Sequence, residues 1–248
     1  MIWIAVVTAA ALAPPAPRPA PLLVCAAVSL TESLEAAAAV YRAEGGEPVL
    51  FNFAASNTLA RQVVNGVAAD LFISADEAQM NVAVSAGAVD RATRVDLLMN
   101  RLALIVRAGG PDLRDIGALL GRDVRRVAIG DPDAVPAGVY ARRFLEARRL
   151  WQPLQPRLVP LANVRAVVAA VEHGSADAGI VYETDAAIAK HATTALVMAG
   201  AGAPRIVYPA AVLASSRNPA GARRFLAFLR GPKAAEVFRR HGFTPMSR

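Results

Sequence analysis

Apolar runs alternate with stretches of helical spacing along most of this chain. The pattern is clearest between residues 52 and 81, where an apolar run breaks at Ser56 and a helical pattern continues to Gly66. A second apolar run covers residues 70–74, and Ala75 begins another helical stretch. Strand, helix, strand, helix is the repeating unit of a parallel sheet, so the pattern predicts the α/β fold class.

Two serines follow predicted strands in the same way. Ser29 comes directly after the predicted strand 22–28, and Ser56 follows the predicted strand 48–54. Ser29 and Glu32 have the spacing of a capping box, which predicts Ser29 as the N-cap of the next helix, and Ser56 repeats this pattern. The carboxyl ends of parallel strands meet at one edge of a sheet, where open α/β sheets bind ligands. We therefore expect the two serines to lie side by side at such an edge.

Similar units continue in the second half of the chain. Strands are predicted over residues 126–129 and 158–161, and a helix follows each of them. The second of these helices begins at Val164, with Asn163 as its predicted N-cap. A further strand over residues 179–182 ends in a tyrosine.

Apolar segments that cross between the two halves are predicted near residues 100 and 205. We therefore expect two α/β lobes. The first would contain residues 22–100 plus 209–248, and the second residues 101–208.

The predicted strand over residues 206–214 contains Pro209. Proline has no N–H group to donate to a neighbouring strand. This strand is therefore expected at the edge of a sheet or at the crossing between the lobes.

The first 13 residues, MIWIAVVTAAALA, are apolar and end in small residues, and prolines follow as far as Pro21. We interpret residues 1–21 as a signal peptide and a proline-rich spacer, which predicts export from the cytoplasm. A membrane anchor needs about 18 or more apolar residues, so this run is too short. Cys25 is the only cysteine, and we expect it in the core of the first strand.

The chain carries a formal net charge of +7, which favours the attraction of anions. Its arginines occur in pairs on predicted helices. A surface that binds nucleic acid usually interleaves aromatic residues with its basic ones, and the sequence contains no such run. We therefore expect no nucleic-acid partner.

Catalysis finds little support in the sequence. It lacks GxSxG, HExxH, CxxC and P-loop motifs. The three histidines, His173, His191 and His241, fall near helix ends or in polar loops. Ser29 or Ser56 would act as a nucleophile only with a base nearby, so a hydrolase stays as an alternative.

Four aspartates are candidates for a hard-metal site, namely Asp70, Asp76, Asp131 and Asp133. All four also fit turns and helix caps, where they need no metal. We expect no cofactor and no direct bond between the protein and a metal.

Hydroxyl groups and free amides at helix starts are the stronger signal. A helix N-terminus leaves its first N–H groups unpaired and carries partial positive charge, so it binds anions readily. Ser29 and Ser56 add hydroxyl donors there. Ala137 and Val164 fall in the first turns of two later helices, where their amides are available, and Tyr182 adds a phenol at a strand end.

Five stretches of this sequence resemble the periplasmic molybdate-binding proteins of bacterial ABC importers, and the similarity covers about residues 22–243. They are AAVSLTESL (26–34), NFAASNTLARQVVNGVAADLFISADEAQMN (52–81), GDPDAVPAGVYARRFLE (130–146), NVRAVVAAVEHGSADAGIVYETDA (163–186) and YPAAVLASSRNPAGARRFLAFLRGPKAAEVFRRHGF (208–243).

The resemblance implies a two-lobe periplasmic binding protein of type II fold, with a ligand cleft between the lobes. The ligand would be molybdate, with tungstate as a second ligand, and molybdenum would be held only as the oxyanion. The family's ligand contacts, carried over by position, fall on Ser29, Ser56, Ala137, Val164 and Tyr182. The implied protein is a periplasmic monomer without enzymatic activity that delivers its ligand to a membrane permease.

Two alternatives share this fold. One is a carrier for sulfate or another tetrahedral oxyanion. The other is the effector lobe of a LysR-type regulator, which the predicted export signal argues against.

Overall fold

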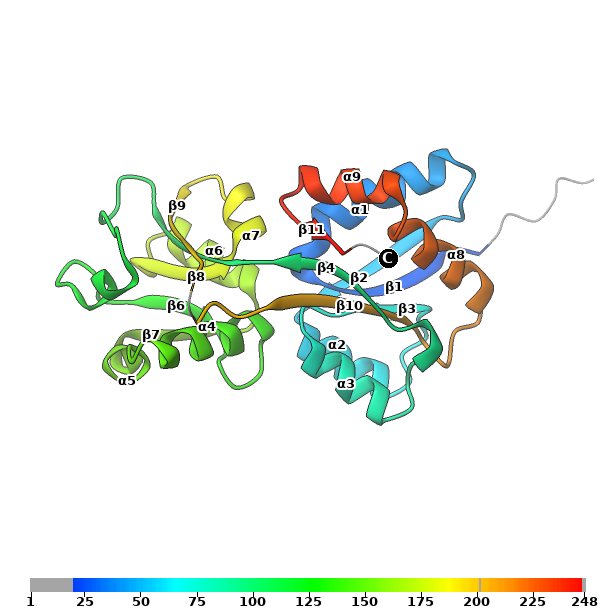
Figure 1. Cartoon of the computed structure of the whole chain (residues 1–248), viewed down its shortest axis with the longest axis horizontal. Helices are drawn as coiled ribbons and strands as arrows, with labels where there is room; N and C mark the ends of the chain where they lie inside the picture. Colours follow the sequence, from blue (N-terminus) through cyan, green and yellow to red (C-terminus); the bar gives the residue numbers. More distant parts are fainter. Residues whose placement is uncertain (1–19, 201, 247–248) are drawn as a thin grey trace, which may run out of the picture.

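The computed structural model describes residues 20–200 and 202–246, which form two α/β lobes side by side (Figure 1). Each lobe has its own sheet, and two extended segments of the chain run between the lobes. The predicted α/β class with two lobes is confirmed. The predicted signal peptide and spacer, residues 1–21, lie outside the described residues except for Ala20 and Pro21.

The first lobe contains a six-stranded sheet with the order β11-β4-β10-β3-β1-β2. Its strands are β1 (Leu22–Ala27), β2 (Val49–Ala54), β3 (Leu71–Ile73), β4 (Val95–Asn100), β10 (Ile206–Val212) and β11 (Thr244–Pro245). Strand β1 is parallel to both β2 and β3, so the carboxyl ends of these three strands meet at one edge. Strand β10 joins this sheet at Ile206, slightly before the predicted return at residue 209.

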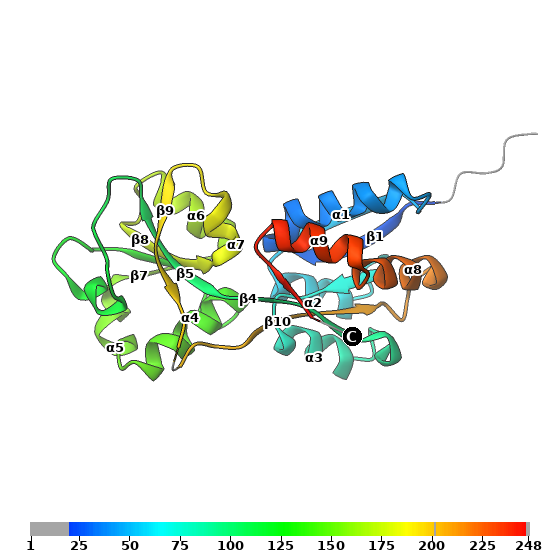
Figure 2. The ribbon, with the colours of Figure 1, turned by 45° about the horizontal axis from the view of Figure 1, so that its top comes forward.

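Helices cover both faces of the first sheet. They are α1 (Thr31–Ala43), α2 (Ser56–Val64), α3 (Glu77–Ser85), α8 (Pro219–Leu229) and α9 (Pro232–Arg240). Helices α1, α8 and α9 lie together on one face, and α2 and α3 lie on the other (Figures 1 and 2).

The second lobe contains a five-stranded sheet with the order β7-β6-β8-β5-β9. Its strands are β5 (Leu102–Arg107), β6 (Val127–Gly130), β7 (Leu158–Leu161), β8 (Ala178–Tyr182) and β9 (Ala192–Met198). Its helices are α4 (Pro136–Ala147), α5 (Trp151–Leu154), α6 (Val164–Glu172) and α7 (Glu183–Ile188). Helices α4 and α5 lie on one side of this sheet and α6 and α7 on the other (Figure 1).

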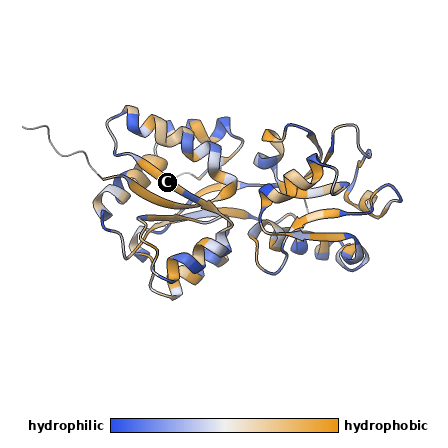
Figure 3. Ribbon diagram, turned by 180° about the vertical axis from the view of Figure 1, so that it is seen from behind, coloured by the Kyte–Doolittle hydropathy of each residue, from blue (hydrophilic) through white to orange (hydrophobic). Residues whose placement is uncertain are grey.

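The strands form the centre of the hydrophobic core, and the helices supply much of the rest. Strands β3, β6, β8 and β10 are buried at every position, and Figure 3 shows hydrophobic colouring along the sheets of both lobes. Continuous apolar strands of this kind are expected where helices cover both faces of a sheet. Cys25 is fully buried within β1 as a free thiol, as the sequence predicted. Within residues 20–200 and 202–246, none of the helices combines the length and hydrophobicity needed to cross a membrane.

The predicted helix caps at Ser29 and Ser56 are wrong. Ser29 lies inside a short 3-10 turn (Val28–Leu30), and Ser56 is the first residue of α2, whose N-cap is Ala55. Neither serine makes a side-chain cap hydrogen bond. Both hydroxyl groups instead bond to distant parts of the first lobe, because strand ends bring those parts close.

Of the two positions predicted for the strand that contains Pro209, the sheet edge is wrong, whereas β10 does follow the crossing between the lobes (Figure 1). Strand β10 lies inside the sheet, between β4 and β3. The pairing with β4 shifts register between Tyr208 and Pro209, and such a bulge accommodates a residue that has no N–H group. The carbonyl oxygen of Pro209 still accepts a hydrogen bond from the Ser74 N–H.

Two glycines allow helix α4 to begin very close to strand β6. A Cβ atom built on Gly138 would lie 2.0 Å from the carbonyl oxygen of Gly130. No side chain fits at such a distance from a backbone atom. This close contact fixes the position of the first turn of α4 against the end of β6.

We predict that Gly138→Ala lowers the free energy of unfolding by about 1–3 kcal/mol, because the helix start must move to relieve the overlap. Urea unfolding of both proteins measures the difference. Gly231→Ala at the N-cap of α9 is the comparison and should cost less, since its added Cβ would lie 3.1 Å from the nearest atom, the Phe228 carbonyl oxygen, and a small shift relieves that contact. Equal stability of the Gly138→Ala variant and the wild type would contradict this packing argument.

Candidate functional site

A small cavity lies between the two lobes, with about 230 Å³ of empty space including its opening to solvent. It is lined by Ala27, Val28, Ser29, Ala54, Ala55, Ser56, Ala75, Val135, Pro136, Ala137, Asn163, Val164 and Tyr182. All five ligand contacts suggested by the sequence are among these residues. The structure therefore brings them together, whereas their role as ligand contacts stays a prediction.

Strand ends and helix starts place these groups at the cavity. Strands β1 and β2 end directly before the two serines, and Tyr182 is the last residue of β8. Helices α2, α4 and α6 begin at Ser56, Pro136 and Val164. The first-turn N–H groups of a helix have no partner within that helix, and they carry partial positive charge. Three helix N-termini therefore direct positive potential toward one cavity.

The hydroxyl group of Ser56 is arranged to donate into the cavity. Its oxygen accepts a hydrogen bond of 2.9 Å from the backbone N–H of Ala75. Ala75 is held in place by the adjacent start of α3, where Asp76 caps the helix by accepting from the Gln79 N–H at 2.9 Å. Because a backbone N–H only donates, the proton of Ser56 is not used in this contact.

Tyr182 carries a buried hydroxyl group that has no hydrogen-bond partner among the described residues. The residue is only 2% exposed. Burial raises the pKa of its phenol well above the usual value, with nearby Tyr208 as the next cause, so the group stays protonated and neutral. An unpaired buried donor costs about 1–3 kcal/mol, and a bound acceptor in the cavity would remove this cost.

No residue that lines the cavity carries a charge. Asn163 also lines it and caps α6 as predicted, because its side-chain oxygen accepts from the Ala166 N–H at 3.0 Å. The side-chain oxygens of Ser56 and Asn163 thus already accept bonds from the protein. The lining offers mainly neutral donors, an arrangement that suits an anion without a proton.

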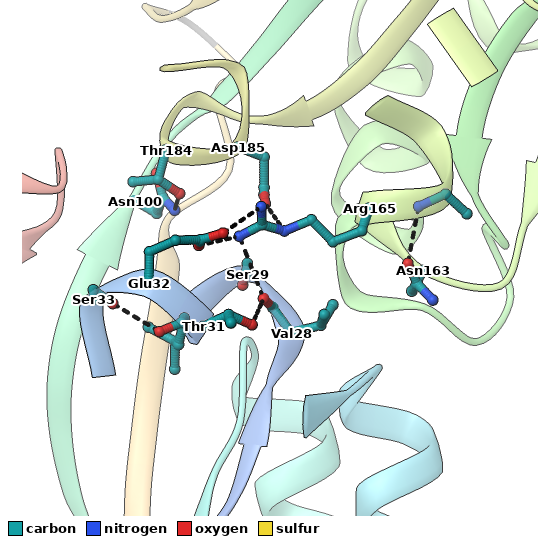
Figure 4. Close-up of polar contacts among 12 residues, drawn as sticks. Val28, Ser29, Thr31, Glu32, Ser33, Asn100, Asn163, Arg165, Thr184 and Asp185 are labelled. Atoms are coloured by element: carbon teal, nitrogen blue, oxygen red, sulfur yellow. Dashed lines mark hydrogen bonds and ion pairs between the residues drawn. The ribbon is translucent and has the colours of Figure 1, made fainter. Parts of the chain in front are cut away.

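A charged bridge joins the two lobes beside the cavity, and the sequence analysis missed it (Figure 4). Arg165 in α6 donates to both carboxylate oxygens of Glu32 in α1, at 3.0 and 2.6 Å. Its Nε lies 3.0 Å from a carboxylate oxygen of Asp185, and another nitrogen lies 3.5 Å from the carbonyl oxygen of Val28. Glu32 therefore serves the contact between the lobes rather than a capping box.

Asp185 is the most unusual ionisable group at this bridge. It is fully buried, and burial raises the pKa of its carboxyl to about 7, even though the Arg165 cation opposes this shift. Glu32 adds to the rise through its negative charge. The carboxyl therefore titrates near neutral pH.

The histidines and aspartates considered for catalysis or metal binding have other contacts. His173 and His241 are the C-terminal caps of α6 and α9, and no histidine lines the cavity. Across the described part of the chain, no three His, Cys, Asp or Glu side chains gather as a metal site. Asp70 accepts from the Leu23 N–H and the Ser216 hydroxyl, which holds loops of the first lobe together.

Comparison with known proteins places this architecture in a family. A family model described as bacterial extracellular solute-binding protein matches residues 22–244. The chain belongs to this solute-binding protein family. The match confirms the predicted two-lobe binding-protein fold.

Several molybdate-binding proteins are relatives of this solute-binding protein. Molybdate-binding protein ModA of Escherichia coli is 39% identical over 230 residues, which are 90% of this chain and 88% of the relative. The ModA protein of Haemophilus influenzae is 33% identical over 231 residues, with 91% and 90% covered. The solved structure of the periplasmic molybdate-binding protein of Azotobacter vinelandii gives a TM-score of 0.80 at 26% identity, covering 90% of this chain and 98% of that one. These relatives confirm the family resemblance that the sequence showed.

We predict that Asp185 makes a contribution to the unfolding free energy of this solute-binding protein that falls as the pH rises from about 4 to about 7. The native protein holds a proton on Asp185 in this window, whereas the unfolded chain releases it near the ordinary pKa of 3.8. Asp185→Asn removes this contribution, so between the two pH values the stability of the variant should gain about 1 kcal/mol or more relative to that of the wild type.

Chemical unfolding of both proteins at several pH values measures the two slopes. Asp133→Asn is the control, because this aspartate is largely exposed and lies outside the bridge. Identical pH slopes for the wild type and Asp185→Asn would contradict the assignment.

Proposed function

We propose that this protein binds molybdate, and tungstate as well, and delivers it to the permease of an ABC importer. The observation that carries the proposal is the cavity between the lobes, whose lining is neutral and rich in hydrogen-bond donors. The names of the relatives from Escherichia coli and Haemophilus influenzae support molybdate as the ligand.

A doubly charged anion in this cavity is held by donors instead of a countercharge. The donors are the hydroxyl groups of Ser29, Ser56 and Tyr182 and the first-turn amides of α2, α4 and α6, including those of Ala137 and Val164. Hydrogen bonds to a charged group contribute about 1.5–3 kcal/mol each. Several such bonds are sufficient for micromolar or tighter binding after the cost of association.

The same lining discriminates between anions. Hydrogen phosphate keeps a proton at neutral pH, and that proton needs an acceptor. No carboxylate lines the cavity to accept this proton, so phosphate would leave a buried donor without a strong acceptor. Sulfate has no proton but is smaller than molybdate, and longer contacts around it would weaken every bond.

Binding without catalysis is part of the proposal. The hydroxyl groups of Ser29 and Ser56 contact the phenol of Tyr208 and the N–H of Ala75, neither of which is a base suited to activate a nucleophile. We propose no cofactor, a monomeric protein and a periplasmic location reached through the signal peptide in residues 1–21.

The bridge of Arg165 to Glu32 supports a cleft that closes over the ligand. Glu32 lies three residues after Ser29, and Arg165 directly follows Val164, so the ion pair joins the lobes one helical turn from the cavity. A cleft that closes excludes water from the anion and strengthens its hydrogen bonds.

We predict that Ser29→Ala and Ser56→Ala each lower molybdate affinity about tenfold or more, because each removes a donor to a charged group. Isothermal titration calorimetry measures the dissociation constants. Ser33→Ala is a matched control, since this serine is also buried in the first lobe but donates to the Leu30 carbonyl away from the cavity. Unchanged affinity in both cavity variants would rule out this donor arrangement.

A panel of anions tests the choice of ligand. Molybdate and tungstate should raise the unfolding temperature of the wild type, whereas phosphate should have no effect and sulfate a much smaller one. Differential scanning fluorimetry at neutral pH and constant ionic strength measures these shifts. A larger shift with sulfate than with molybdate would mean that the protein is a sulfate carrier.

A further inference from the structure

A buried chain of hydrogen bonds leads from the crossing strands to the cavity. Asn100 is the last residue of β4 and pairs with Ile206 of β10, and Tyr208 lies two residues further along β10. Asn100 is 7% exposed and Tyr208 is fully buried. The phenol oxygen of Tyr208 lies 3.1 Å from the hydroxyl oxygen of Ser29, which lines the cavity. The direction of each hydrogen bond in this series determines whether Ser29 can donate its proton to a ligand.

The orientation of the Asn100 amide is fixed by its neighbour. The backbone N–H of Arg101 lies 2.8 Å from one end of this amide. A backbone N–H only donates, so that end must be the oxygen. The reverse orientation would place two donors against each other. The NH₂ group of Asn100 therefore points away from Arg101.

This NH₂ group donates to two hydroxyl oxygens. One is Thr184 in the second lobe, at 2.9 Å, and the contact is drawn in Figure 4. The other is the phenol of Tyr208, at 3.2 Å. Because Tyr208 accepts from Asn100, its own proton is left for its other partner among the described residues, the oxygen of Ser29.

Ser29 then accepts from Tyr208 and keeps its own proton for the cavity. We propose that Asn100 and Tyr208 are positioning residues that fix Ser29 as a hydrogen-bond donor to the bound oxyanion. This inference rests on the proposed function and deepens it. The hydroxyl oxygen of Ser56 likewise accepts a hydrogen bond, in this case from the backbone N–H of Ala75. In both cases a donor from the first lobe occupies the serine oxygen and leaves the hydroxyl proton for the anion.

The direction of the relay matters because hydroxyl groups can reverse. A Ser29 hydroxyl that donated to Tyr208 would present only lone pairs to the anion, and these repel it. Asn100 opposes this reversal, because its NH₂ group only donates to the phenol, and a Ser29 that donated as well would leave the Tyr208 proton without an acceptor among the described residues. The same NH₂ group also donates to Thr184 in α7 of the second lobe, so this series of hydrogen bonds includes a contact between the two lobes.

The decisive variant is Asn100→Asp, which has nearly the same shape but places an acceptor where the NH₂ group was. Tyr208 would then donate to the new carboxylate and accept from Ser29, which takes the Ser29 proton away from the anion. Molybdate affinity, measured by calorimetry, should fall about tenfold or more. Part of this loss comes from repulsion between the added negative charge and the anion. The same substitution must therefore also be measured in a variant without the Ser29 hydroxyl group.

The Ser29→Ala background separates the two effects in a double-mutant cycle. There the Asn100→Asp penalty should be at least about threefold smaller, because only the charge effect remains. Equal penalties in both backgrounds would overturn the inference. A merely structural role of Asn100 would lower affinity to the same extent whether or not residue 29 carries a hydroxyl group.

Tyr208→Phe provides an independent test if Asn100→Asp does not fold. It should weaken molybdate binding about two- to tenfold in the wild-type background and have little further effect in the Ser29→Ala background. Equal losses in both backgrounds, or no loss in the wild-type background, would overturn the inference. Asn65→Asp, which adds a charge at the exposed end of α2, should leave affinity unchanged.

The wild-type titration separates this inference from the proposed function. If the wild type binds no molybdate, the proposed function fails and the inference fails with it. If the wild type binds molybdate and the cycle shows no coupling to Ser29, only the inference fails.

Discussion

An unprotonated oxyanion can only accept hydrogen bonds, and this constraint explains the polar chemistry between the lobes. Every group that faces such an anion must be a donor, and a hydroxyl group is a dependable donor only when its oxygen is already occupied. Ser56 meets this requirement through Ala75, and Ser29 through Tyr208. Tyr182 has no partner among the described residues and stays protonated because burial raises its pKa.

The fold supplies these donors with few specialised residues. Parallel strands in both sheets end at the same cavity, and helices begin there, so backbone amides supply part of the lining. Small residues are needed for this arrangement, as the contact between Gly138 and Gly130 illustrates. The bridge of Arg165 to Glu32 then holds the two halves of the site together without placing a charge in the cavity.

Local patterns in the sequence were sufficient to predict most of the elements and to single out five residues that the structure brings to one cavity. Apolar runs and helix starts placed Ser29 and Ser56 at one sheet edge, because parallel strands share an edge. The same patterns gave wrong predictions where a side chain bonds to a residue far away in the sequence. The capping box of Ser29 was wrong because Tyr208, far along the chain, takes its hydroxyl group, and Glu32 pairs with Arg165. Spacing along a chain carries no information about such pairs, and Pro209 shows that a bulge can place proline inside a sheet.

A crystal structure of the protein with bound molybdate tests the central claim most directly. The account predicts that the anion lies between the lobes, with its oxygens within about 3.2 Å of the hydroxyl groups of Ser29, Ser56 and Tyr182 and no side chain bonded to the metal. An anion located elsewhere, or one held by a charged side chain in place of these hydroxyl groups, would contradict it.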